Sequence, residues 1–163
     1  MRKLIAVDSG KTGSYSLVNN EEIQRIEIHN LDEIGEFIDH MKEIQDQVES
    51  NHAITAVVEQ PPPFTGNFSV PSSRGFKLGE SYGQVCGVLR ALGFPLVLVK
   101  PREWQRSLPG LKGLSGHHRK RVLTDCARRL MPSAKITVRN ADSALIAYQF
   151  LRTRNNTQSK ATL

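Results

Sequence analysis

The sequence has few cysteines and no long apolar stretch. Its 163 residues include two cysteines, Cys86 and Cys126, which lie 40 positions apart and form no Cys-x-x-Cys pair. We therefore expect buried, reduced thiols rather than a disulfide framework or a zinc site. Apolar runs such as residues 4–7 and 56–58 are far too short to cross a bilayer, so no membrane contact is expected. The basic residues 1–3 are followed by only four apolar residues before Asp8, which does not fit a signal peptide.

Acidic residues are scarce in the second half of the chain. Residues 1–94 hold 8 Lys and Arg against 13 Asp and Glu, a net charge of −5, whereas residues 95–163 hold 14 against 3, a net charge of +11. A surplus of this size in one half favours a partner that carries phosphate groups. A basic surface that contacts only solvent is the simpler alternative, because charge describes partners and not folds.

The order of the predicted elements indicates an α/β fold with a mixed sheet. The first three strands read as an antiparallel meander, and Asn30 is the expected N-cap of the first helix. Residues 1–153 are expected to form a single domain, and residues 154–163 a polar, disordered tail. In chain order, the expected strands are residues 3–8, 15–18, 23–29, 53–59 and 95–100, and the expected helices are residues 31–49, 75–92, 102–108, 117–131 and 141–152.

Prolines and glycines mark two unusual segments between the strands. Residues 60–74 contain a triple proline and no periodicity, which predicts a stiff loop. The helix that follows carries four glycines spaced four residues apart, at positions 75, 79, 83 and 87, which places them on one face. Each glycine costs about 1 kcal/mol relative to alanine inside a helix, so we expect another element to approach this face closely. That element is either the protein's own sheet or the same helix of a second subunit.

Three acidic residues stand where elements end or begin. Asp8 and Glu59 each end an apolar strand, and Asp142 opens the last helix. Carboxylates that converge at one edge of a sheet repel one another, so they need a cation between them. Hard oxygen ligands suit Mg²⁺ or Mn²⁺ rather than zinc. The pattern therefore predicts a site for two such ions, which clamp an in-line phosphoryl displacement.

Several segments, taken in order, resemble the RuvC-type Holliday junction resolvases. They are Ile5-Ala6-Val7-Asp8-Ser9-Gly10, Ala56-Val57-Val58-Glu59-Gln60, Leu78-Gly79-Glu80-Ser81-Tyr82-Gly83, Pro101-Arg102-Glu103-Trp104, Lys120 in a basic helix, and Ala141-Asp142-Ser143-Ala144-Leu145. The resemblance spans residues 3–152, and the Pro-x-x-Trp motif is similar to phage-encoded and organelle-type members. It implies an RNase H-like fold, a homodimer, and Mg²⁺-dependent symmetric nicking of four-way DNA junctions, with no small-molecule cofactor. A cytoplasmic location in a bacterial or phage-infected cell is expected, or an organelle matrix for a mature eukaryotic chain.

The resemblance also implies roles for single residues. Asp8, Glu59 and Asp142 would hold the metal ions, Lys120 would lie beside the scissile phosphate, and Phe64 would enter the junction. The other predicted DNA-binding residues are Arg74, Arg102, Lys112, Arg119, Arg121 and Arg139.

Two positions depart from the pattern of that family. Arg139 stands where a fourth acid or a histidine is usual, and Gln105 stands where a basic residue is frequent. Arg139 cannot bind a metal, so we expect it to grip a phosphate through its guanidinium group. These departures leave room for a junction-binding relative without activity, and a nuclease of the same fold that acts on RNA–DNA hybrids is the other alternative. Residues 7–13 look like the first phosphate motif of actin-like ATPases, but that fold needs a second lobe with a second such motif.

Overall fold

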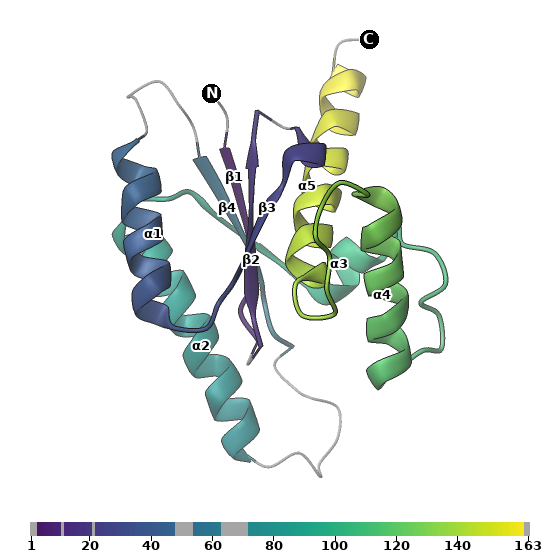
Figure 1. Cartoon of the computed structure of the whole chain (residues 1–163), viewed down its shortest axis with the longest axis horizontal. Coiled ribbons are helices and arrows are strands. Elements are labelled where there is room, and N and C mark those ends of the chain that lie inside the picture. The colour runs from purple at the N-terminus through teal and green to yellow at the C-terminus, as the bar shows by residue number, and fades with distance from the viewer. Residues whose placement is uncertain (1–2, 11, 21, 48–53, 63–71, 162–163) are drawn as a thin grey trace.

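A five-stranded sheet with helices on both faces makes up the protein (Figure 1). The computed structural model describes residues 3–10, 12–20, 22–47, 54–62 and 72–161. The strands are β1 (Lys3–Asp8), β2 (Ser14–Asn19), β3 (Glu27–Asn30), β4 (Ile54–Glu59) and β5 (Leu96–Val99), and the sheet order is β3-β2-β1-β4-β5. The helices are η1 (Ile23–Arg25), α1 (Ile34–Asp46), α2 (Ser72–Ala91), α3 (Pro101–Gln105), α4 (Gly116–Leu130) and α5 (Ala141–Ala161).

The direction of the strands brings the two predicted acidic strand ends together. Strands β1, β2 and β3 pair antiparallel, whereas β1, β4 and β5 run parallel. The central strand β1 is buried on both faces, which explains its continuous apolar run. In the pairing of β1 with β4, Val7 lies opposite Val58, so Asp8 and Glu59 follow at the same edge of the sheet.

The sheet separates two apolar clusters. Alternate residues of β1 and β4 belong to different clusters because side chains alternate across a strand. Helices α1 and α2 cover one face, and α3, α4 and α5 cover the other (Figure 1). Cys86 lies in the cluster under α1 and α2, and Cys126 lies in the cluster under α3, α4 and α5. Both are buried and free, as the sequence predicted. No helix among the described residues is long and apolar enough to cross a membrane.

Helix α5 reaches the sheet through small buried side chains. Ala141, Ala144 and Ala147 are fully buried, which lets the helix backbone lie close to β1 and β2. Ser143 is also fully buried, and its Oγ lies 2.8 Å from Oγ of Ser14 and 2.9 Å from Oγ of Ser16. These hydroxyl contacts fix the first turn of α5 over strand β2.

Several element boundaries differ from the sequence-based expectation. Asn30 is the last residue of β3 and pairs with Ser14, so α1 begins later, at Ile34. The expected third strand is divided into the short turn η1 and the strand β3, which begins at Glu27. The last helix was expected to end at Arg152, but α5 continues to Ala161 through most of the predicted tail. The division of the chain into a domain and a tail remains a prediction.

The glycine face of α2 is turned away from the sheet. A Cβ atom placed on Gly75, Gly79, Gly83 or Gly87 would meet no atom of the described residues within 4 Å, apart from the nearby backbone of the helix itself. Phe76 is 71% exposed on the same helix. The close approach that this face permits is therefore not made by the protein's own sheet.

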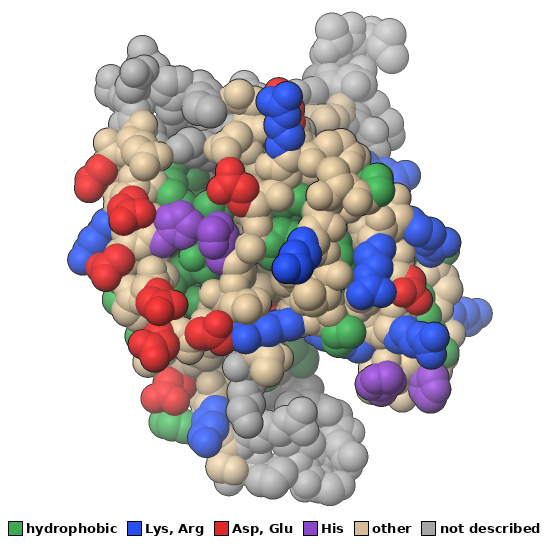
Figure 2. Space-filling view, in the orientation of Figure 1, with side chains coloured by type: hydrophobic (Ala, Val, Ile, Leu, Met, Phe, Trp, Pro, Cys, Tyr) green, Lys and Arg blue, Asp and Glu red, His purple; other side chains and the backbone are tan. Residues whose placement is uncertain are grey.

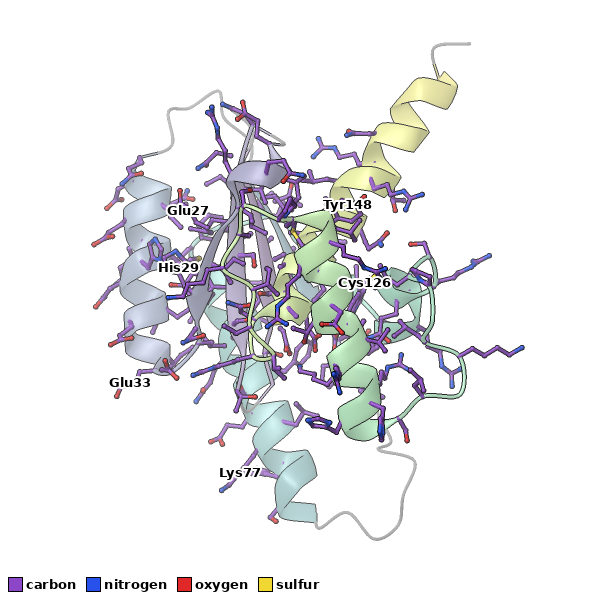
Figure 3. All side chains as sticks on the ribbon, turned by 45° about the vertical axis from the view of Figure 1, so that its right-hand side comes forward. Glu27, His29, Glu33, Lys77, Cys126 and Tyr148 are labelled. Carbon is purple, nitrogen blue, oxygen red and sulfur yellow. The ribbon has the colours of Figure 1, made fainter. Side chains whose placement is uncertain are left out.

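Aromatic and histidine rings join α1 to the edge of the sheet. Tyr15 stacks on His29 with ring centres 5.0 Å apart, and its hydroxyl lies 2.7 Å from Nδ1 of His40 on α1. The two histidine rings meet edge to face at 4.8 Å. His29 lies beside α1, as does Glu27 from the same strand (Figure 3). Burial lowers the pKa of His29 below its usual value of 6.5, His40 lowers it further, and Glu27 opposes the change.

We predict that His29 makes the protein less stable in acid. The unfolded chain takes up a proton on His29 at its ordinary pKa of 6.5, before the folded protein does, so the free energy of unfolding falls as the pH drops below that value. The variant His29→Phe keeps a ring against Tyr15 but cannot titrate, so its stability should fall less. Urea unfolding of both proteins from pH 8 to pH 5 measures the difference, with the exposed His117→Phe as the control. Equal pH dependence of the wild type and His29→Phe would contradict this role.

Candidate active site

Three carboxylates lie within electrostatic reach of one another at one edge of the sheet. Asp8 ends β1, Glu59 ends β4, and Asp142 lies in the first turn of α5. Asp8 is affected by the charge of Asp142, and Glu59 is affected by both of the other acids. The convergence expected from the sequence is therefore present, although these residues are more than 50 positions apart in the chain.

Asp8 is held by the turn that follows its strand. The backbone N–H of Gly10 donates to Oδ1 of Asp8 at 3.0 Å. Burial raises the pKa of the Asp8 carboxyl, and the charge of Asp142 raises it further, while Gly10 and Lys120 oppose the rise. A side chain at Gly13 would come within 2.5 Å of the Asp8 carbonyl oxygen, so the turn needs a glycine there.

Glu59 is a second carboxyl group whose pKa is raised. Burial raises its pKa to about 8, the charge of Asp8 adds to the rise, and a hydrogen bond from Trp104 opposes it. In that bond, Nε1 of Trp104 donates to Oε2 of Glu59 at 2.6 Å. An ionised Glu59 therefore needs a positive charge nearby at neutral pH.

Lys120 supplies positive charge to this cluster from α4. Its ammonium group lies 2.6 Å from Oδ2 of Asp142, in an ion pair that is partly shielded from water. Burial alone would lower the pKa of Lys120, but Asp142, Asp8 and Glu59 raise it, so the side chain stays protonated. The resemblance implies that Lys120 lies beside the scissile phosphate, and its contact with Asp142 brings it to the three carboxylates.

The donor set fits a hard divalent cation. Each acid has one oxygen bound by a protein donor: Gly10 binds Asp8, Trp104 binds Glu59, and Lys120 binds Asp142. The other oxygen of Asp142 is buried and has no hydrogen-bond partner. Oxygen ligands of this kind are typical of Mg²⁺ and Mn²⁺ sites. Among the described residues, no three acidic, histidine or cysteine side chains lie close enough together to share one ion.

Other predicted DNA-binding residues lie on the side of the molecule that carries α3 and α4. Arg119 donates to Oε1 of Gln105, which joins these two helices. Figure 2 shows Lys and Arg gathered over α4 and acidic side chains over α1. Three residues predicted to contact phosphate are exposed in this region: Arg102 on α3, Lys112 in the following loop, and Arg121 on α4.

Three of the predicted residues are placed differently or lie outside the description. Arg139 forms an ion pair with Asp32, with Nη2 2.5 Å from Oδ1, so the side chain is bound to an acid and not free beside the carboxylates. Arg74 lies in the first turn of α2. Phe64 lies outside the described residues.

Sequence reasoning missed two features that position the carboxylates. The Pro-x-x-Trp motif gave no sign that the buried indole of Trp104 donates to Glu59. Sequence reasoning also did not find the contacts of Ser143 with Ser14 and Ser16. A serine in the first turn of a helix is common, so the sequence carried no signal for these contacts.

Two solved structures have the same fold. No protein-family model and no curated protein matches this sequence. The chain superimposes on T. thermophilus RuvC in complex with Holliday junction substrate with a TM-score of 0.62 and 15% identity, covering 95% of this chain and 96% of that chain. A second Thermus thermophilus RuvC structure gives a TM-score of 0.58 and 18% identity, covering 95% and 97%. The predicted RNase H-like fold with a mixed central sheet is thereby confirmed.

Proposed function

We propose that this protein is a metal-dependent endonuclease that resolves four-way DNA junctions by symmetric nicking. The observation that carries the proposal is the convergence of Asp8, Glu59 and Asp142, with Lys120 against them, at one edge of the sheet. One of the solved structures that share the fold is a RuvC bound to a Holliday junction substrate, which supports this substrate class.

The three carboxylates would hold two Mg²⁺ ions, for which Mn²⁺ could substitute. They would bind through the oxygens that Gly10, Trp104 and Lys120 leave unpaired. When bound, the ions activate water and stabilise the leaving oxygen of the phosphodiester. The raised pKa values of Asp8 and Glu59 support the need for such cations, since both carboxyls resist ionisation without them.

Lys120 and the arginines would have different roles toward DNA. Lys120 lies against the carboxylates, where its charge can stabilise negative charge that develops on the scissile phosphate. Arg74, Arg102, Lys112, Arg119 and Arg121 would contact phosphates farther from the cut. Arg139 would have to leave Asp32 to bind a phosphate. Phe64 would enter the junction and stack on an unpaired base.

A homodimer would place two such sites on a substrate with two-fold symmetry. The bare glycine face of α2 and the exposed Phe76 support an interface there, because glycines allow two helices to approach closely. Two identical sites related by a two-fold axis would match two symmetric cuts.

The first test compares substrates and carboxylate variants. The wild type should nick a labelled four-way junction with Mg²⁺ but not with EDTA, and should cut neither linear duplex nor RNA–DNA hybrid. Asp8→Asn, Glu59→Gln and Asp142→Asn should each abolish nicking and keep or tighten junction binding, because they remove a ligand and a negative charge but no basic contact. Asp125→Asn, an exposed acid on α4, is the matched control and should nick normally.

Each contrary result of this test has a meaning. Cutting of the hybrid but not the junction would favour a nuclease for RNA–DNA hybrids. Junction binding without nicking in either Mg²⁺ or Mn²⁺ would favour a binding protein without activity. Loss of binding together with nicking in the three acid variants would mean that the acids maintain the structure.

Two neighbouring residues of α4 are expected to have different effects, one on the rate of nicking and the other on DNA binding. Lys120→Ala should slow nicking about 10²–10³-fold at saturating DNA, because a charge that stabilises the transition state is lost. Arg121→Ala should leave that rate unchanged and weaken binding. The slope of log affinity against log salt concentration should fall by about one, the value for one phosphate contact. Single-turnover nicking and binding at several salt concentrations measure both effects. Nicking at the wild-type rate by Lys120→Ala would show that α4 is not part of the active site.

The dimer can be tested on the glycine face itself. Gly83→Gln should keep the monomer folded, because glutamine favours a helix and open space surrounds the position. It should nevertheless prevent dimer formation if two α2 helices meet there. Gly35→Gln on α1, which also faces open space, is the control and should remain dimeric. Light scattering without DNA measures the mass, and a wild-type monomer or a dimeric Gly83→Gln would each contradict this interface.

A further inference from the structure

The single tryptophan of the chain lies against one of the three acids. Trp104 is only 5% exposed, yet its indole nitrogen donates to Oε2 of Glu59 at 2.6 Å. A donor at this distance from a carboxylate makes a strong, charge-assisted hydrogen bond. The rest of the ring belongs to the apolar cluster that includes Leu108 and Ile146. Packing thus holds the ring, while its polar atom faces the carboxylate.

The backbone around Trp104 is fixed by local hydrogen bonds. Pro101 begins α3 one residue after the end of β5, and its ring presets the helical φ angle. The N–H of Lys100 donates to Oε2 of Glu103 at 2.8 Å, and the N–H of Glu103 donates to the carbonyl of Lys100 at 2.9 Å. The position of the indole is therefore set by a closed turn of helix and does not depend on a flexible loop.

The two partners of the hydrogen bond follow from the paired strands β4 and β5. Glu59 lies opposite Val99 in the parallel pairing of β4 with β5, and the N–H of Gln60 donates to the carbonyl of Val99 at 2.8 Å. Trp104 follows Val99 by five residues. The donor and the acceptor thus follow from neighbouring points of one sheet.

The chemistry of the indole differs from that of Lys120. Indole has one N–H donor, no acceptor and no charge, so it orients a carboxylate without neutralising it. Lys120, by contrast, brings a full positive charge to Asp142. No described residue donates to Oε1 of Glu59, which leaves one oriented carboxyl group with a free oxygen.

We propose that Trp104 is a positioning residue that restricts Glu59 to binding a metal ion through one oxygen, Oε1. This inference rests on the proposed role of Glu59 as a metal ligand. Hydrogen bonds to the outer side of a metal ligand commonly change metal affinity or activity 10–100-fold, which is about the effect expected here. One-oxygen ligation suits the octahedral geometry of Mg²⁺, whereas a free carboxylate can also bind Ca²⁺ through both oxygens.

The contact can be measured without any nuclease assay. Because the chain has one tryptophan, a ¹H–¹⁵N spectrum contains one indole resonance, which belongs to Trp104. Glu59→Gln should move this resonance, since a carboxamide oxygen replaces the carboxyl oxygen as the acceptor, and Mg²⁺ should shift it in the wild type but not in the variant. Asp125→Asn should leave it unchanged. An indole resonance at the same position in the wild type and Glu59→Gln would overturn the proposal.

The effect on the reaction is measured on Trp104→Phe, which keeps most of the ring but lacks the donor. Its nicking rate at saturating junction should fall 10–100-fold, or its half-saturating Mg²⁺ concentration should rise about tenfold, with KM for the junction within about twofold of the wild type. Ca²⁺ should inhibit this variant more strongly than the wild type. Leu108→Ala, from the same buried cluster, is the control for loss of packing and should keep the wild-type dependence on Mg²⁺.

The two proposals can fail separately. Wild-type nicking together with an unchanged rate and unchanged Mg²⁺ dependence in Trp104→Phe would overturn the role of Trp104 and leave the nuclease in place. A wild type that nicks nothing, but whose indole resonance moves with Mg²⁺ and with Glu59→Gln, would support the contact and overturn the proposed reaction.

Discussion

The buried hydrogen bonds among Ser14, Ser16 and Ser143 are the contact on which the geometry of the site depends. Hydroxyl groups are costly to bury without partners, so the three serines favour one position of α5 on the sheet, in which they satisfy one another. Ser14 lies opposite Asp8 in the sheet, and Ser143 follows Asp142 in the helix. A shift of α5 by one turn would separate these hydroxyls and carry Asp142 away from Asp8. A neutral contact thus holds two charges together that repel each other.

Sequence reasoning succeeded where the signal was local and failed where it depended on distant partners. Asp8 and Glu59 could be placed because parallel strands end at a common edge, and the apolar runs before them are unambiguous. The start of α1 could not be placed from Asn30, because its pairing with Ser14 extends β3 to that residue and displaces the helix start. The partner of Arg139 is Asp32, which lies 107 positions away in the chain. Composition cannot predict an ion pair between residues so far apart.

The two halves of the chain divide the surface by charge as well as by sequence. Acidic side chains cover α1, and basic side chains cover α4, on opposite sides of the sheet (Figure 2). The ion pair of Arg139 with Asp32 joins the segment before α5 to the segment before α1. An acidic surface repels phosphate, so it would direct a DNA backbone to the α4 side, where the proposed contacts lie. Under the proposed function, this division of charge would favour one orientation of the DNA as well as its binding.

The exposed part of α2 has a consequence for how the molecule moves. From residue 73 to residue 84 no described side chain is buried, and the first buried residue of this helix is Val85. This end of α2 extends past the sheet (Figure 1) and contains three of the four glycines. Helical turns with few tertiary contacts open more easily than the core, so amide hydrogens there should exchange with solvent before those around Leu89. The protein thus has a stability gradient along one helix, and whatever covers its free end also determines how long that end stays helical.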